Sequence, residues 1–279
     1  MIIRPGEIKT AQLHAYLLGS VSPRPICFAS TVDAEGNQNL SPFSFFNVFG
    51  SNPVTLVFSP ARRVRDNTIK HTLENCLSTR EVVISVVNYA MVQQMSLASC
   101  EYPKGVSEFE KAGFTPKAAT LVKPALVAES PVNMECIVKE VIETGQEGGA
   151  GNLIICEMKV MHIHDAVLNA EQQIDPHKID LVARMGGDFY CRASGDAVFT
   201  VPKPNLQLGI GIDQLPESIR SSKVLSGNDL GMLANVSAIP ARDHTFVYQK
   251  QVDLHEDAKA MLAQNKVEDA WQILLSAAS

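Results

Sequence analysis

Two long segments in which apolar and polar residues alternate constrain the fold of this chain most strongly. They run from Val132 to Glu143 and from Asn152 to His164. Because successive strand side chains point to opposite faces, this alternation is typical of a strand with one buried face. In the second segment the apolar phase shifts near Val160, which predicts a β-bulge there. The glycine-rich link between the segments is flexible and long for a hairpin turn, and we expect the two strands to pair antiparallel.

Several shorter segments extend this pattern. Strand-forming residues predict further strands over Pro25 to Val32, Asn52 to Ser59 and Glu81 to Asn88. A helical spacing follows the second of these, with Asp66 or Asn67 as the expected cap. The run from Ser107 to Glu110 matches a capping box, in a short helix that Gly113 would end. Alternating strands joined by short helices favour an antiparallel barrel over a doubly wound sheet.

The character of the chain changes near residue 195, where a stretch rich in Pro and Gly begins. The tail beyond it is amphipathic, with apolar residues at helical spacing: Ala263, Val267, Ala270, Trp271 and Leu274. We therefore divide the chain into a β-rich core over residues 1–194 and a mixed loop and helix extension over residues 195–279. We expect the extension to pack on the barrel or on a dimer partner.

Composition argues against several classes of partner. With 24 Lys and Arg against 30 Asp and Glu, the net charge is −6, which gives no general attraction for nucleic acid or anionic lipid. We find no apolar leader and no run of about 18 apolar residues, so we expect a cytoplasmic protein that does not enter the membrane. The 6 cysteines form no CxxC pair and are expected to be reduced, buried packing residues. His162 and His164 share a strand face, but spacing suggests no third ligand, so we predict no metal site.

The segment from Asn39 to Phe49 concentrates aromatic residues, since it holds Phe43, Phe45, Phe46 and Phe49 of the 11 Phe in the chain. It could be a buried strand, an exposed surface for a partner, or the wall of a binding site. Pro42 lacks an N–H, so we expect strand pairing to lapse around it and leave backbone groups free for a ligand. Aromatic side chains on both faces favour a segment that is buried on two sides.

A cluster of cations precedes the first predicted helix. Arg62, Arg63 and Arg65 are followed by Asn67 and Thr68. The free N–H groups of a helix start, with arginine forks beside them, suit a phosphate group. The alternative is a solvated, capped helix start, and the spacing alone does not decide between the two.

A glycine pair, Gly186 and Gly187, stands between Arg184 and Tyr190. Two adjacent glycines let the backbone approach a flat ligand closely, although such a pair is more often only a turn. The chain lacks the common sequence motifs for nucleotide binding and for a catalytic nucleophile. It has no GxSxG, no P-loop and no GxGxxG between a strand and a helix.

Five motifs occur in a fixed order over residues 20–192: PRPICFAST at 23–31, NLSPFSFFN at 39–47, RDNT at 65–68, SEFEKAGF at 107–114 and RMGGDFY at 184–190. In this order the chain resembles the flavin reductase-like family of FMN-binding split barrels, to which flavoredoxins belong. The resemblance implies a mainly β fold, a six-stranded Greek-key split barrel with short flanking helices. It also implies a homodimer with FMN near the dimer interface.

The resemblance places fourteen residues at the cofactor: Ser30, Thr31, Ser41, Pro42, Phe43, Ser44, Phe45, Asn47, Arg65, Asn67, Thr68, Arg184, Gly186 and Gly187. Ser30 and Thr31 match positions near the ribityl and phosphate portion, and residues 41–47 match the loop along the isoalloxazine. The family's Lys-Asp-Thr phosphate segment is matched to residues 65–68, which leaves open whether Asn67 or Thr68 contacts the phosphate. Arg184 and the two glycines match a late motif that approaches the flavin.

This resemblance leads to an expected function. The protein would take hydride from NADH or NADPH onto bound FMN and pass electrons to a flavin, a redox protein or another acceptor. No catalytic acid or base is visible, and none is required, because the cofactor carries the chemistry. Two alternatives share the same motifs: a non-enzymatic FMN-binding electron carrier and a flavin-free binding protein on the same fold.

Overall fold

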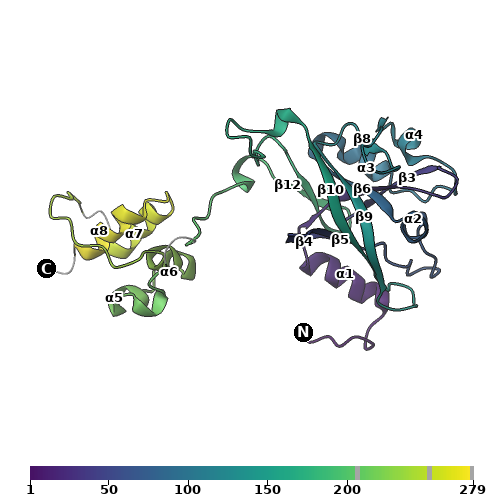
Figure 1. Cartoon of the computed structure of the whole chain (residues 1–279). Coiled ribbons are helices and arrows are strands. Elements are labelled where there is room, and N and C mark those ends of the chain that lie inside the picture. Colours follow the sequence, from purple (N-terminus) through teal and green to yellow (C-terminus); the bar gives the residue numbers. More distant parts are fainter. Residues whose placement is uncertain (205–207, 250–252, 277–279) are drawn as a thin grey trace. The chain divides into compact units, whose positions relative to one another are not determined.

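The computed structural model describes residues 1–204, 208–249 and 253–276. Clustering of contacts divides the chain into two compact units, Met1–Phe199 and Thr200–Ser279. Figure 1 shows the first unit as mainly strands and the second as helices. The division falls a few residues after the boundary at 194 that the sequence predicts.

The first unit is built on a seven-stranded sheet with the strand order β3-β2-β6-β9-β10-β5-β4. Every neighbouring pair in this sheet is antiparallel. Its strands are β2 (Cys27–Val32), β3 (Gln38–Phe43), β4 (Phe46–Ser51), β5 (Val54–Phe58), β6 (Glu81–Val86), β9 (Val132–Glu143) and β10 (Asn152–Ile163). The predicted fold class, mainly β with short flanking helices, is confirmed.

The two alternating segments form the longest pair, β9 with β10, as predicted. The register shifts between Met158 and Val160, which confirms the bulge expected there. A second shift lies between Ile155 and Cys156. Each bulge adds a residue to one strand and bends it, and these bends help the sheet to curve around its core.

The aromatic segment crosses from one edge of the sheet to the other. It contains β3 and β4, the two edge strands, and the chain passes between them at Ser44 and Phe45. The main sheet therefore has seven strands rather than the six that the resemblance implied. Beyond the Phe46–Phe58 pair, the Ser59 amide donates to the Phe45 carbonyl at 2.9 Å, and the Phe43 ring of β3 packs on the Phe58 ring of β5 with centroids 5.3 Å apart.

Strand pairing does not lapse at Pro42, contrary to the prediction. Pro42 lies opposite Phe28, and the ladder continues to the pair of Phe43 with Cys27. Because β3 is an edge strand, the missing N–H of a proline there need not cost a ladder hydrogen bond.

Smaller elements complete the first unit. A three-stranded sheet joins β1 (Arg24–Pro25), β11 (Val182–Gly186) and β12 (Phe189–Arg192), and β7 (Pro116–Lys117) pairs with β8 (Leu126–Val127). The α-helices are α1 (Thr10–Ser20), α2 (His71–Thr79), α3 (Val92–Leu97) and α4 (Glu108–Ala112). Short 3-10 turns are η1 (Tyr89–Met91), η2 (Asp165–Val167) and η3 (Gly195–Ala197).

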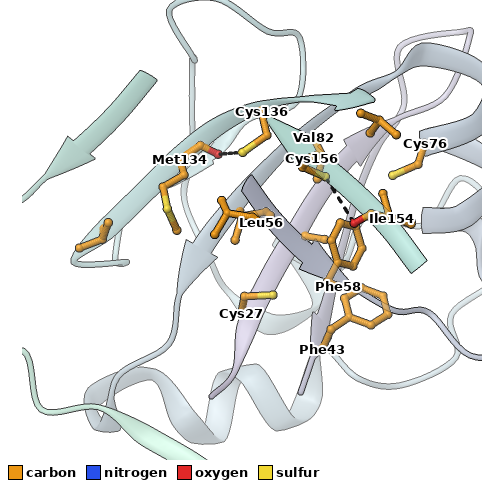
Figure 2. Packing of buried hydrophobic residues seen from close by; sticks show 14 of the residues in the cluster. Cys27, Phe43, Leu56, Phe58, Cys76, Val82, Met134, Cys136, Ile154 and Cys156 are labelled. Atoms are coloured by element: carbon orange, nitrogen blue, oxygen red, sulfur yellow. Dashed lines mark hydrogen bonds between the residues drawn. The ribbon is translucent and has the colours of Figure 1, made fainter. Parts of the chain in front are cut away.

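The core inside the sheet is unusual for its thiols. Figure 2 shows Cys27, Cys76, Cys136 and Cys156 packed with aromatic and aliphatic side chains of the same cluster. Burial raises the pKa of both Cys76 and Cys136 to about 12, so these thiols stay protonated. The prediction of buried packing cysteines is right for these four, but Cys100 is exposed and Cys191 is half-buried.

Strand β2 is buried on both faces. Cys27 and Ala29 join the inner cluster, whereas Ile26 and Phe28 belong to a second cluster. That second cluster includes Met95 and Phe109, from α3 and α4. The alternation of the strand therefore connects the barrel core to its helical cover.

Two predicted helix starts differ from the structure. Helix α2 begins only at His71, with Lys70 as its N-cap, because Asn67 adopts a left-handed conformation with φ 57°. Ser107 is the N-cap of α4 but makes no capping hydrogen bond, and the buried Glu108 carboxylate instead accepts the Leu40 amide at 2.9 Å. Gly113 ends α4 in the left-handed conformation, as predicted.

The second unit has its own core. After the turn η4 (Ile212–Gln214), it contains α5 (Glu217–Arg220), α6 (Gly227–Ala234), α7 (Leu254–Leu262) and α8 (Val267–Leu275). The amphipathic tail is thus two helices, divided near Asn265, which has a φ of 60°. Trp271 is buried and donates its indole N–H to the Leu233 carbonyl at 3.1 Å.

None of the helices in the described ranges is both long enough and apolar enough to cross a membrane.

Candidate functional site

Three cavities of the first unit have Ser44 in their lining. Ser44 belongs to the link of two residues, Ser44 and Phe45, that joins β3 to β4, and we call this link the passage. We call the three the cationic, aromatic and inner cavities. Their volumes are about 270, 590 and 190 Å³. Ligand sites in proteins typically measure roughly 300 to 1,000 Å³, and the aromatic cavity alone is within this range.

The cationic cavity brings Arg62, Arg63 and Lys70 against the wall formed by residues 42–45. Burial lowers the pKa of Lys70 below its usual range, and the nearby charge of Arg63 lowers it further. The Lys70 amine lies 5.3 Å from the centroid of the Phe43 ring, a cation–π contact. Three cations at one cavity favour an anionic ligand group.

Two loops hold these arginines in place. Arg63 donates to the Glu101 carboxylate at 2.7 Å and to the Ile69 carbonyl at 2.9 Å. On the other side, the glycine-rich loop after β9 lies directly against the arginine loop, and a Cβ at Gly148 would be 3.0 Å from the Arg63 carbonyl. This loop, expected from the sequence only as a flexible link, therefore packs against the backbone of Arg63.

Arg65, Asn67 and Thr68, the predicted phosphate residues, lie outside this cavity. Arg65 is 72% exposed and pairs with Asp66 and Glu101, at 2.9 and 3.0 Å. Thr68 donates its hydroxyl to Asp66 at 2.6 Å, and Asn67 accepts from Arg62 at 2.8 Å. Since α2 starts later than predicted, these three residues brace the loop rather than form the helix start.

Lys70 and Thr72 flank His71 at the start of α2. The Thr72 hydroxyl is buried and accepts from the Asn39 side chain at 3.1 Å. The order Lys70-His71-Thr72 keeps the lysine and threonine of the family's Lys-Asp-Thr segment at their spacing. This spacing is the signal from which Lys70 could have been found.

The aromatic cavity is lined by Arg24 and by residues 44–47, including Phe45 and Asn47. Arg24 is only 6% exposed, and it donates to the Leu18 and Val21 carbonyls at the end of α1, at 2.6 and 2.7 Å. Its Nε donates to the Ser44 hydroxyl at 3.4 Å. Arg24 therefore holds the end of α1 against the link at Ser44. It is not among the cofactor residues predicted from the sequence.

The aromatic side chains are less buried than predicted. Phe43 lies in the core, but Phe45 is 40% exposed and Phe49 is 69% exposed. Phe45 contacts His14 of α1 edge-on, with ring centroids 6.2 Å apart. The expectation of a segment buried on two sides is wrong for this chain taken alone, because β4 is an edge strand with an open face.

The inner cavity lies on the other side of the passage and includes Arg184 and Tyr190 beside Pro42 and Ser44. Arg184 donates to the Tyr190 hydroxyl at 2.5 Å and to the Gly187 carbonyl at 2.7 Å. Gly186, two residues further on, lies against α1. With φ 100°, it lets the backbone of α1 approach, since a Cβ there would lie 3.1 Å from the Leu18 carbonyl.

The remaining predicted residues line none of these three cavities. Ser30 and Thr31 are fully buried in β2, and the Thr31 hydroxyl accepts from Asn39 and Asn75. The Ser30 hydroxyl has no partner among the described residues. Ser41 is half-buried in β3. The structure thus brings residues 42–45, Asn47 and Arg184 to the three cavities. Ser30 and Ser41 lie apart from them.

The two histidines of the strand face have separate roles. His162 lies 2.6 Å from the buried Glu135 carboxylate, and His164 accepts the Ala166 amide at 3.1 Å. Within the described residues, no three His, Cys, Asp or Glu side chains gather as metal ligands would.

Comparison with known proteins identifies the class to which this fold and site belong. A family model described as "Flavin reductase like domain" matches residues 18–176, which is more than half of the chain. The chain therefore belongs to the flavin reductase-like family, a family of flavin-binding oxidoreductases.

The chain is also similar to individual proteins and solved structures. An uncharacterized protein of Aquifex aeolicus is 34% identical over 189 residues, covering 68% of this chain and 94% of the relative. Nitrilotriacetate monooxygenase component B from Bacillus cereus superposes with a TM-score of 0.66 at 25% identity, covering 72% and 98%. A protein of Shewanella frigidimarina described as a flavin reductase with a split barrel domain gives 0.60 at 27%, covering 73% and 99%.

These relatives are covered almost completely, whereas about a quarter to a third of this chain has no counterpart in them. The family model also ends before the helical unit begins. The helical unit therefore lies outside the part of the chain that the family model matches.

Proposed function

We propose that this protein is an FMN-dependent oxidoreductase that takes hydride from NADH or NADPH and passes electrons to a flavin or another acceptor. The observation that carries the proposal is the cationic cavity, where Arg62, Arg63 and Lys70 face the wall of residues 42–45. A phosphate group suits the cations, and a flat ring suits the wall beside it. Bound FMN would supply the redox chemistry itself.

The residues of the chain bind and orient the cofactor. Lys70, Arg62 and Arg63 hold the phosphate, and Pro42 to Phe45 cover the ring and exclude water. Arg24 and Arg184 pair across β1 and β11 and bring two positive charges to the region of Ser44. Positive charge at this place favours the cofactor's reduced, more negative state.

The six free cysteines agree with a reducing cytoplasm.

A homodimer forms part of the proposal. Phe45, Val48 and Phe49 are exposed on or beside the edge strand β4, next to the aromatic cavity. A cluster of exposed aromatic and aliphatic side chains favours contact with another protein surface. A second copy over this face would cover the phenylalanines and close the cofactor site.

The phosphate assignment is tested by FMN titration of variants. Lys70→Met should weaken FMN binding about 10- to 100-fold, because a charge-assisted hydrogen bond contributes roughly 1.5 to 3 kcal/mol. Arg65→Ala is the matched control and should change the affinity less than about threefold, since Arg65 lies outside the cavity. If Arg65→Ala weakens binding and Lys70→Met does not, the phosphate lies at residues 65–68 instead.

The wild-type protein tests the wider proposal. The purified protein should bind FMN and oxidise NADH or NADPH when flavin is added. Flavin binding without turnover above the free-flavin background would indicate an electron carrier. A protein that binds no flavin at all would contradict the proposed function and leave a binding protein on the same fold.

A further inference from the structure

A fourth cavity, of about 410 Å³, lies between the turn and helix at residues 89–97 and the hairpin of β11 and β12. Its lining includes Tyr89, Gln93, Ser96, Arg184, Tyr190 and Arg192. We call it the stacked-arginine cavity. Its size is within the usual range for ligand sites, roughly 300 to 1,000 Å³.

Both arginines lie over aromatic rings. The Arg192 guanidinium carbon lies 3.8 Å from the Tyr89 ring centroid, and that of Arg184 lies 4.7 Å from the Tyr190 ring centroid. Asp180 accepts from Nε and Nη2 of Arg192, at 2.7 and 2.8 Å. Guanidinium groups fixed in this way lose little entropy when they bind a further anion, which is why stacked arginines suit phosphate recognition.

The charges of the two arginines differ. Asp180 neutralises Arg192, whereas Arg184 forms no ion pair with a carboxylate in the described part of the chain. Asp188, on the turn between β11 and β12, also lines the cavity. With Arg192 paired to Asp180, the cavity keeps Arg184 as a cation without an ion pair in the described residues, and Asp188 as a carboxylate in its lining. An arginine of this kind suits a phosphate group, and the carboxylate can accept a hydrogen bond from a sugar hydroxyl.

This cavity adjoins the candidate flavin site. Arg184 and Tyr190 line both the stacked-arginine cavity and the inner cavity, and the inner cavity includes Pro42 and Ser44. Arg184 and Tyr190, which are joined by a hydrogen bond of 2.5 Å, therefore form the boundary that the two cavities share.

We propose that the stacked-arginine cavity binds the phosphate-bearing end of a second nucleotide, one that exchanges electrons with the flavin bound at Ser44. The position of this second nucleotide rests on the proposed function. Two sources share its chemistry: a nicotinamide dinucleotide that donates electrons, and a second flavin nucleotide that accepts them. Tyr89, Gln93 and Arg192 line this cavity alone among the four, so they can be changed without touching the proposed flavin residues.

The test uses two variants of the whole chain and ADP as a probe, because ADP carries a base, a ribose and two phosphates. Gln93→Glu places a negative charge on an exposed position of α3, and Arg192→Gln removes a positive one. Calorimetric titration should show ADP binding to the wild-type protein and a loss of about tenfold or more in affinity in each variant. FMN affinity should stay within about twofold. Arg4→Gln, which removes an exposed arginine paired with Glu7, should change neither affinity.

Steady-state kinetics then separates the two sources. A raised KM for NADH or NADPH in the variants identifies the electron donor as the occupant, and a raised KM for added flavin identifies the acceptor. The proposal is overturned if ADP does not bind the wild-type protein, or if Gln93→Glu, correctly folded by circular dichroism, leaves ADP affinity and both KM values unchanged. A failure of FMN to bind the wild-type protein would instead contradict the proposed function, and ADP titration without flavin would still report on this cavity.

Discussion

The two units of this chain form their hydrophobic cores from different secondary structure. The first unit closes a sheet around a cluster that includes thiols, and it leaves charged side chains at several cavities. The second unit packs short helices around Trp271, whose indole N–H is satisfied by a backbone carbonyl. The family model matches only the first. The comparison teaches that the proposed chemistry belongs to the sheet, while the helical unit is stabilised by its own core.

The largest expected effect comes from opening a cavity in either core. Leu56→Ala in the sheet and Leu233→Ala in the helical unit both remove fully buried side chains. Each should lower the free energy of unfolding of its own unit by about 2 to 5 kcal/mol. The chain has 1 Trp, so tryptophan fluorescence follows the helical unit alone, and bound flavin follows the sheet.

The pair distinguishes two independent units from one cooperative structure. If the units are independent, Leu233→Ala shifts only the fluorescence transition in urea, and Leu56→Ala shifts only the release of flavin. A shift of both transitions by either variant would show that the units unfold together.

A smaller effect is expected from acid. Burial alone would raise the pKa of Glu135, but hydrogen bonds from His162 and from the backbone amides of residues 120–122 outweigh it and lower that pKa to about 2. The sheet should therefore lose on the order of 3 kcal/mol as the pH falls from about 4.5 towards 2, because the unfolded state binds a proton that the folded state does not.

The same acid titration compares the two units. The sheet transition should fall more steeply with pH than the fluorescence of Trp271. Glu135→Gln should remove most of this pH dependence at a cost in stability at neutral pH, whereas Glu140→Gln, at an exposed position of the same strand, should leave it intact. An unchanged pH profile in Glu135→Gln would show that other carboxylates govern acid unfolding.

The smallest effect is expected from removing the helical unit altogether. A chain that ends at Phe199 should bind FMN within about twofold of the full-length affinity, since the proposed cofactor residues all lie in the first unit. Flavin titration of both chains measures this. A loss of tenfold or more would mean that the helical unit contributes directly to the cofactor site.

The sequence predicted the elements that depend on local pattern. The β9 and β10 pair, its bulge near Val160 and the glycine end of α4 follow from alternation and backbone freedom, and all are confirmed. The site was harder to predict. Helix α2 begins later than predicted because Asn67 takes a left-handed conformation, and Lys70 lines the cationic cavity whereas Arg65 does not.

Other site residues could not be found from local pattern at all. Arg24 reaches the passage through contacts with α1, and Gly148 matters because it lies against the arginine loop, more than eighty residues earlier. Such contacts depend on tertiary packing, which propensity and spacing do not encode. The exposed Phe45 likewise reflects the position of β4 at a sheet edge, which one segment cannot reveal.

The distribution of thiols gives the protein a natural chemical reporter. All six cysteines lie in the first unit, four of them in its core, while Cys100 is exposed and Cys191 lines the stacked-arginine cavity. A maleimide reagent should therefore modify Cys100 quickly and the four core thiols only when the sheet opens. The rate of labelling at those four positions therefore measures how often the sheet opens. No engineered probe is needed, and the helical unit, which has no cysteine, gives no signal.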